Sequence, residues 1–142
     1  MVSRKSWVLD PNSGGVSVPP HHQPDIRSRI EAYASEYFAG RYERLEIRFK
    51  GVFCYIDAFV EPQEPSPGLL EITKETKEQF MDRLRSTPRR LCRMRYFGDD
   101  RWSFGFFSYS NEQYQLAVFD SGDFFGSIVK GFEVAASVHL FD

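Results

Sequence analysis

Apolar residues recur with a helical period at the start of the chain's regular part. Between positions 24 and 39, apolar side chains stand at 26, 30, 33, 34, 37 and 38, which gathers them along one side of a helix. Pro24 suits the first turn of a helix, and Gly40 suits the position just after its last turn. We therefore expect a helix over 24–39.

A period of two follows. Leu45, Ile47 and Phe49 alternate with polar residues, as in a strand with one buried face. The pair Lys50-Gly51 predicts a tight turn into a second strand over 52–60, which is apolar on both faces except at Asp57. A strand that is apolar on both faces lies inside a sheet rather than at its edge.

Prolines then interrupt the pattern, so the segment 61–70 is predicted to be a loop. A second helix is expected over about 73–86, closed by Pro88. Thr76 and Gln79 have the spacing of a capping box near its start. Its inward residues are expected to be Phe80, Met81 and Leu84.

Aromatic residues dominate the next part of the chain. Eleven of the 23 Phe, Tyr and Trp residues lie between Tyr96 and Phe125, and such side chains favour a pleated, half-buried surface. We expect three strands over 91–97, 102–109 and 113–119, with a loop at 120–126 after them. Ser127 is expected to cap a last helix that reaches Val138. Its buried residues would be Ile128, Phe132, Ala135 and Ala136.

The predicted order is α-β-β-α-β-β-β-α, which describes a single α+β domain at 24–142 behind an irregular N-terminal arm at 1–23. Trp7 is the large side chain expected to pin this arm to the domain. Short turns favour antiparallel pairing, so we expect a five-stranded, mostly antiparallel sheet with helices packed on one face. The long connection from 60 to 91 leaves the order of the two strand groups open.

Composition narrows the class of protein. The 142 residues are 42% hydrophobic and 27% charged, with a net charge of −2 at pH 7, as in ordinary soluble domains. The sequence shows no apolar stretch typical of a membrane helix or a signal peptide. Cys54 and Cys92 are far apart in apolar segments, so we expect a cytoplasmic protein with two reduced, buried thiols.

Positive charge gathers in one segment. Six arginines and no acid lie between 83 and 98, and Arg93 and Arg95 share one face of their predicted strand. Arg48 joins them with Tyr55 or Tyr109 in a candidate binding face, because guanidinium groups grip phosphate and rings stack on bases. The alternative is a solvated face whose arginines pair with carboxylates of neighbouring strands. A pI near 5.9 argues against a dedicated nucleic-acid binder.

Asp57 is the second candidate, because a charge inside an apolar strand is costly without a partner. It is either a general base or metal ligand or a surface carboxylate paired with an arginine. Its helpers in the first case would be Glu61, Asp120 and Asp123. The histidines lack metal-ligand spacing, and the sequence contains no glycine-rich nucleotide loop. We therefore expect neither metal nor cofactor.

Three segments carry a resemblance: LEIRFKGVFCYIDAFVE at 45–61, LCRMRYFGDDRWSFGF at 91–106 and GDFFG at 122–126. They look like parts of a group of small bacterial proteins without an assigned function. The resemblance extends to residues 5–7 and 38–42. It implies a bacterial, intracellular, stand-alone domain, and it implies no activity, cofactor or catalytic residue.

The sequence thus predicts a small intracellular binding or accessory domain rather than an enzyme. It does not identify the ligand. Two alternatives stay open. One is nucleic-acid or nucleotide binding through the face of Arg48, Arg93 and Arg95, and the other is small-molecule catalysis by Asp57. The partner is either another protein or a nucleic acid, and an open sheet edge would let two copies pair as a homodimer.

Overall fold

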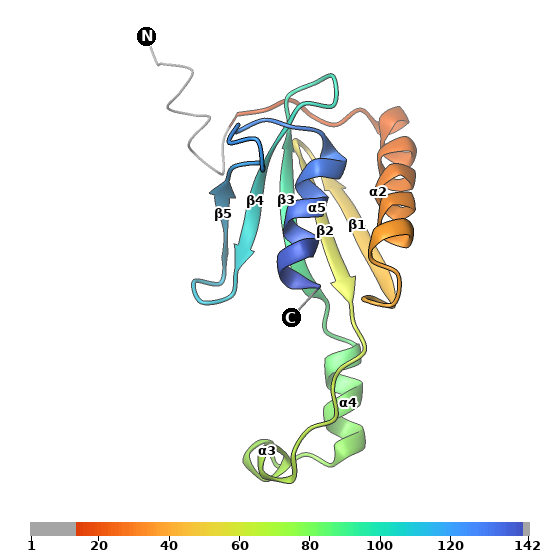
Figure 1. The fold of residues 1–142 in the computed structure, drawn as a ribbon, viewed down its shortest axis with the longest axis vertical. Coiled ribbons are helices and arrows are strands. Elements are labelled where there is room, and N and C mark those ends of the chain that lie inside the picture. Colours follow the sequence, from red (N-terminus) through yellow and green to blue (C-terminus); the bar gives the residue numbers. More distant parts are fainter. Residues whose placement is uncertain (1–13, 141–142) are drawn as a thin grey trace.

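A computed structural model of the chain describes residues 14–140 and contains a five-stranded sheet (Figure 1). The strands are β1 (Arg44–Lys50), β2 (Phe53–Phe59), β3 (Arg89–Tyr96), β4 (Trp102–Ser108) and β5 (Gln113–Ala117). Each strand pairs with the next one along the chain, and every pair is antiparallel. This confirms the predicted fold class and gives the order of the two strand groups, because β2 pairs directly with β3.

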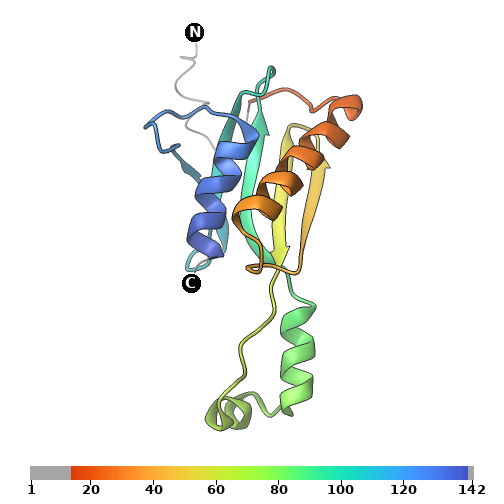
Figure 2. The same ribbon diagram turned by 45° about the vertical axis from the view of Figure 1, so that its right-hand side comes forward.

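Two helices, α2 (Gln23–Tyr37) and α5 (Ile128–His139), lie side by side on one face of this sheet (Figures 1 and 2). The apolar stripe predicted for α2 buries Ile26, Ile30 and Ala34. A short 3-10 helix, η1 (Pro20–His22), precedes α2. No helix among the described residues is both long enough and apolar enough to span a bilayer.

Helix α5 makes the closest approach to the sheet. Ser127 caps it as predicted, since its side chain accepts a hydrogen bond from the backbone N–H of Lys130 at 3.2 Å. The predicted buried residues of this helix are confirmed, and Gly131 is buried with them. A side chain at Gly131 would overlap Met94 on β3, so this glycine lets the helix backbone come close to the strand.

The connection between β2 and β3 differs from the prediction. The segment 61–70 is not all loop, because α3 (Pro67–Thr73) begins inside it, capped by the side chain of Ser66. The second helix does not start at Thr73, because Lys74 adopts a left-handed conformation with φ of 57° and ends α3 there. Helix α4 (Lys77–Arg85) follows, and its predicted capping box is confirmed with both hydrogen bonds present.

The α3–α4 hairpin projects beyond one end of the sheet and covers neither face (Figures 1 and 2). Phe80 and Met81 are buried as expected, whereas Leu84 is half-buried. The helical cover of the sheet therefore comes from α2 and α5, with α4 elsewhere.

The described part of the arm is irregular up to η1. The N–H of Val16 donates to the carbonyl of Tyr96 at 2.8 Å, and the N–H of Val18 donates to that of Gly51 at 3.0 Å. These bonds hold the arm across the end of the sheet. Trp7 lies outside the described residues, so its anchoring role stays a prediction.

Asp100, in the turn between β3 and β4, ties three elements together. Its Oδ1 atom accepts hydrogen bonds from the buried Trp102 indole at 2.9 Å and from the first N–H of α5, at Ile128, at 3.3 Å. The same oxygen lies 2.8 Å from Nη2 of Arg29 on α2. One carboxylate thus joins the sheet to both covering helices.

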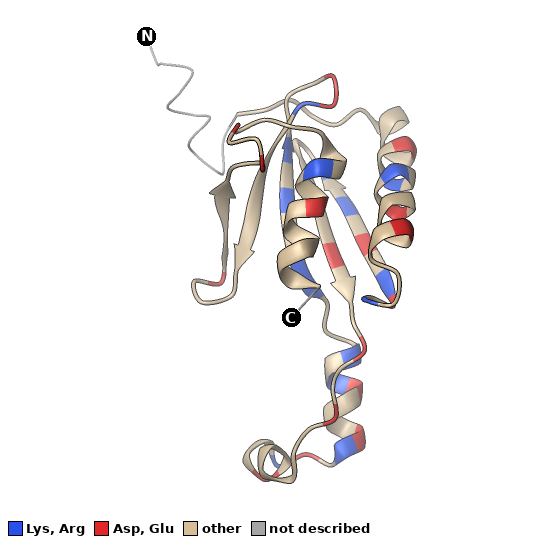
Figure 3. Ribbon diagram, in the orientation of Figure 1, with Lys and Arg blue, Asp and Glu red and all other residues tan. Residues whose placement is uncertain are grey.

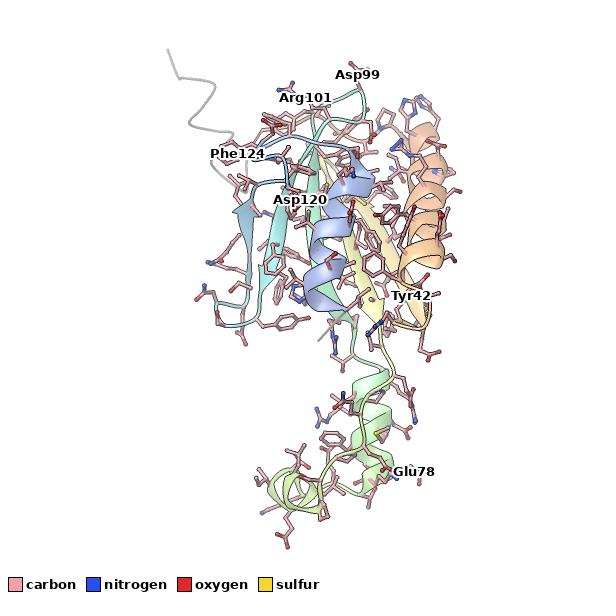
Figure 4. The ribbon with its side chains drawn as sticks, in the orientation of Figure 1. Tyr42, Glu78, Asp99, Arg101, Asp120 and Phe124 are labelled. Carbon is pink, nitrogen blue, oxygen red and sulfur yellow. The ribbon has the colours of Figure 1, made fainter. Side chains whose placement is uncertain are left out.

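We expect Asp100→Ala to lower the free energy of unfolding by about 2–3 kcal/mol, because the change leaves buried donors without an acceptor. Asp99→Ala is the matched control, since the two neighbours have nearly equal positive φ values of 50° and 53° and Asp99 is exposed at the tip of the turn (Figure 4). It should cost less than about 1 kcal/mol. Urea unfolding followed by tryptophan fluorescence measures both, and equal losses would contradict the role of Asp100.

Candidate functional site

The face of the sheet opposite α2 and α5 carries no helix among residues 14–140, and we call it the open face. Strand register assigns six cationic and two acidic side chains to it. The cations are Arg44, Arg48, Lys50, Arg90, Arg93 and Arg95, and the acids are Glu46 and Asp57. The open face is therefore a positively charged surface on a chain whose net charge is −2.

A β-bulge in β3 decides which arginines lie there. Ile56 pairs with Cys92, but the next residue, Asp57, pairs with Arg90, so Leu91 is an extra residue in β3. Regular alternation from Arg93 would place Leu91 on the open face. The bulge puts Arg90 there instead, directly opposite Asp57.

The same bulge turns Arg89 to the helix side. Its Nη1 atom donates to the carbonyl of His139, in the last turn of α5, at 2.7 Å. A cation at this end of a helix is favourable because the carbonyl groups there are unpaired. Two adjacent arginines therefore lie on opposite faces of the sheet: Arg89 bonds to the end of α5, and Arg90 lies on the open face.

Arginines of the open face lie over aromatic rings. The distances from guanidinium carbon to ring centroid are 5.0 Å for Arg48 over Tyr55, 4.2 Å for Arg93 over Phe53 and 5.3 Å for Arg90 over Phe107. Such stacking is attractive and holds the planar groups in defined orientations. The prediction that Arg48, Arg93 and Tyr55 share one face is therefore matched by their placement.

Tyr114, on β5, was not among the predicted site residues. Its ring lies 5.8 Å from that of Tyr55 and 5.2 Å from the guanidinium carbon of Arg93. It has this position because Gly105 on β4 leaves the space: a Cβ at Gly105 would lie 3.3 Å from the Tyr114 Cβ. A glycine inside an aromatic strand is the signal that could have pointed to a ring lying over it.

Four of these side chains, those of Arg48, Tyr55, Arg90 and Tyr114, line an open pocket of about 440 Å³. It is lined by Arg48, Phe49, Lys50, Tyr55, Arg90 and Tyr114. Its volume falls within the range of roughly 300–1,000 Å³ of small-ligand sites. Three cations and two tyrosine rings therefore converge on a space that can hold an anionic group with a flat ring attached.

Asp57 is only 3% exposed, between the two more exposed arginines. Its Oδ2 atom accepts a hydrogen bond from Nη2 of Arg48 at 3.3 Å, and its Oδ1 atom is buried with no hydrogen-bond partner among the described residues. Burial raises the pKa of the Asp57 carboxyl above its ordinary value, against the opposing effect of Arg48 and Arg90. Asp57 is therefore paired with an arginine, as one alternative predicted, but it is buried rather than at the surface.

The acids predicted to assist Asp57 lie elsewhere. Glu61 pairs with Arg85 of α4 at 2.7 Å, and Asp120 lies at the other end of the sheet (Figure 4). Asp123 bonds to Ser121 within its own loop. Within residues 14–140, no group of three or more His, Cys, Asp and Glu side chains could hold a metal ion.

Arg93 shares the open face but does not line the pocket, and two further predicted site residues also lie outside it. Arg95 is 2% exposed, and its Nε donates to the hydroxyl of Ser103 at 3.1 Å. The hydroxyl of Tyr109 accepts a hydrogen bond from the backbone N–H of Arg90 at 2.7 Å, which fastens the start of β3. We therefore centre the candidate site on Arg48, Tyr55, Arg90 and Tyr114.

The two cysteines are buried on the helix side and are not bonded to each other. Burial raises the pKa of the Cys54 thiol to about 12 and raises that of Cys92 well above its ordinary value. Neither thiol is a reactive group, because the thiolate is the nucleophilic form.

No protein-family model, no curated protein and no solved structure matches this chain. The resemblance to a group of small bacterial proteins therefore stays a prediction. The function has to be inferred from the residues of the open face.

We expect Asp57→Asn to remove a pH dependence of stability. Burial raises the pKa of Asp57 in the folded protein above the ordinary value of 3.8, so protonated Asp57 stabilises the folded state at low pH. The wild-type protein loses this contribution to its free energy of unfolding as the pH rises through the folded-state pKa. The variant should therefore gain stability relative to wild type as the pH rises from about 3.5 to about 7.5. Urea unfolding at several pH values measures this gain.

Glu46→Gln is the matched control, since it removes a carboxylate of the same face whose side chain is 40% exposed. It should show a smaller relative change. Parallel stability curves for wild type and Asp57→Asn would contradict the assignment of a buried carboxylate with a raised pKa.

Proposed function

We propose that this protein is a non-enzymatic binding domain whose open face binds single-stranded nucleic acid. The observation that carries the proposal is the alternation of Arg48 and Arg90 with Tyr55 and Tyr114 around one pocket. A guanidinium group matches the geometry of a phosphate, and a tyrosine ring offers a surface on which a base stacks.

The tyrosine rings favour a single strand over a duplex. A base can stack on a protein ring only when its own face is free, as in loops and unpaired strands. The pocket holds two rings, from Tyr55 and Tyr114, and its 440 Å³ suits one nucleotide rather than the width of a helix. A duplex would present phosphates to the arginines and leave the rings unused.

Local charge supports the same ligand. In Figure 3, β3 carries only Lys and Arg among its charged residues, β1 carries three of them with one acidic band, Glu46, and β2 carries a single acidic band, Asp57. Acidic residues of α2 and of the α3–α4 hairpin lie away from this face. Because charges are screened beyond roughly 8–10 Å in physiological salt, a phosphate at the pocket responds to the face rather than to the net charge of −2.

The cytoplasmic location belongs to the same proposal. It is supported by the two unbonded, buried cysteines, which are typical of a reducing compartment. Pairing of two copies through the outer edge of β1 or β5 stays a prediction.

Catalysis by Asp57 is a second candidate, because a buried carboxylate with a raised pKa is common in active sites. Its 4% exposed side chain is shielded from a substrate, which favours binding. Incubation of an end-labelled oligonucleotide with wild type and Asp57→Asn tests this candidate. Cleavage by wild type alone would assign catalysis, and intact oligonucleotide would support a binding role.

We expect wild type to bind a fluorescein-labelled 12-nucleotide single strand with micromolar affinity that weakens steeply with salt. The variant Arg48→Gln/Arg90→Gln, which removes both arginines of the pocket, should bind at least tenfold more weakly. Its salt dependence should be shallower by about two phosphate contacts. Fluorescence anisotropy across a salt series measures both, with the corresponding duplex as a weaker ligand.

The matched control is Arg83→Gln/Arg85→Gln, which removes the same charge from α4, where both arginines pair with glutamates. It should bind within about twofold of wild type. Equal losses in the two double variants, or no binding at low salt, would refute the open face as the site.

A second variant pair tests stacking. Tyr55→Leu should weaken binding about five- to 100-fold, because one base–aromatic contact contributes about 1–3 kcal/mol. Tyr37→Leu is the control, since Tyr37 is 57% exposed on α2, on the other side of the sheet. Equal affinities for the two variants would mean that phosphate contacts alone bind the strand.

A further inference from the structure

The buried carboxylate of Asp57 lies beside the two arginines that would bind the phosphate of the proposed ligand. Its Oδ2 is 3.3 Å from Nη2 of Arg48, and Arg90 lies opposite it in the strand register. Both arginines also line the pocket. An anion that enters the pocket therefore has to share these two cations with a carboxylate that already uses them.

We infer that Asp57 competes with the ligand phosphate for Arg48 and Arg90, and that binding of the phosphate is coupled to protonation of Asp57 from solvent. This inference rests on the proposed function of the open face. Two negative groups around the same pair of cations repel each other, and protonation of the buried one removes that repulsion. Nucleic-acid affinity should then rise as the pH falls, which makes Asp57 a positioning residue that regulates the site.

The surroundings of Asp57 favour the neutral form once the arginines turn to phosphate. Its Oδ1 is buried without a hydrogen-bond partner among the described residues, so one lone-pair site of the carboxylate is left desolvated. Burial costs a neutral carboxylic acid less solvation free energy than it costs a charged carboxylate. Burial already raises the pKa of Asp57 in the free protein, and phosphate would raise it further.

The other titratable and charged groups around Asp57 come from β1, from β3 and from the β4–β5 hairpin beyond it. They are Glu46 and Arg48 on β1, Arg90 and Cys92 on β3, and Tyr109 and Tyr114 of the β4–β5 hairpin. Burial raises the pKa of Tyr114 to about 12 and that of Cys92 well above its ordinary value. Tyr114 and Cys92 therefore stay neutral between pH 5 and pH 8, the two arginines stay cationic, and Glu46 is tested by its own variant.

The experiment measures anisotropy with the 12-nucleotide probe at fixed ionic strength from pH 5 to pH 8, using an oligonucleotide without terminal phosphates. We expect wild-type affinity to fall about tenfold across this range, because the bound phosphate favours the protonated form of Asp57. Asp57→Asn should bind about tenfold more tightly than wild type at pH 8 and within about twofold at pH 5. Circular dichroism confirms that each variant is folded.

Glu46→Gln removes an exposed carboxylate that lies 3.4 Å from Nε of Arg48, so it reports the loss of an acid beside this arginine and should keep the wild-type slope with pH. Calorimetric titration in buffers of different ionisation enthalpy counts the protons directly, with uptake expected for wild type and none for Asp57→Asn. Binding with the same pH slope in wild type and Asp57→Asn would overturn this inference and leave the proposed function intact. Absence of binding at every pH would instead refute the proposed function.

Discussion

The packing of α2 and α5 on one face of the sheet is the constraint on which the other features depend. It buries the side chains that alternate toward the helices, and it leaves the opposite side chains of the same strands without a helical cover. The open face stabilises itself by stacking arginines on rings, as Arg44 does on Phe59 at 3.7 Å. A surface of fixed guanidinium and aromatic groups is a direct result of this one-sided packing.

The bulge at Leu91 links the two faces. It sends Arg89 to the end of α5 and Arg90 to the open side, so one extra residue in β3 both fastens a covering helix and completes the pocket. Asp57, opposite the bulge, is held under the arginines with one oxygen unpaired. Such an arrangement costs folding free energy, and a residue of this kind is informative about function because packing alone does not require it.

Local signals in the sequence predicted most of the elements. The periods of two and of three to four residues located all five strands and the covering helices, and the caps at Thr76 and Ser127 were correct. Helix α3 was missed because Pro67 and Gly68 read as a loop, although Ser66 followed by Pro67 is also a common helix start. The predicted site was partly assembled: Arg48, Tyr55, Asp57, Arg93 and Arg95 share the open face, but Arg95 is buried there.

The sequence by itself determined the α+β class, the elements and the face shared by Arg93 and Arg95, because alternation along a strand is a local property. Only the tertiary structure decided that Arg90 and Tyr114 join the pocket and that Asp57 is buried without a full set of partners. A bulge depends on how two strands pair, and the space over Gly105 depends on the strand beside it. Neither the bulge nor the space over Gly105 can be predicted from one segment alone, since both arise when neighbouring strands pair.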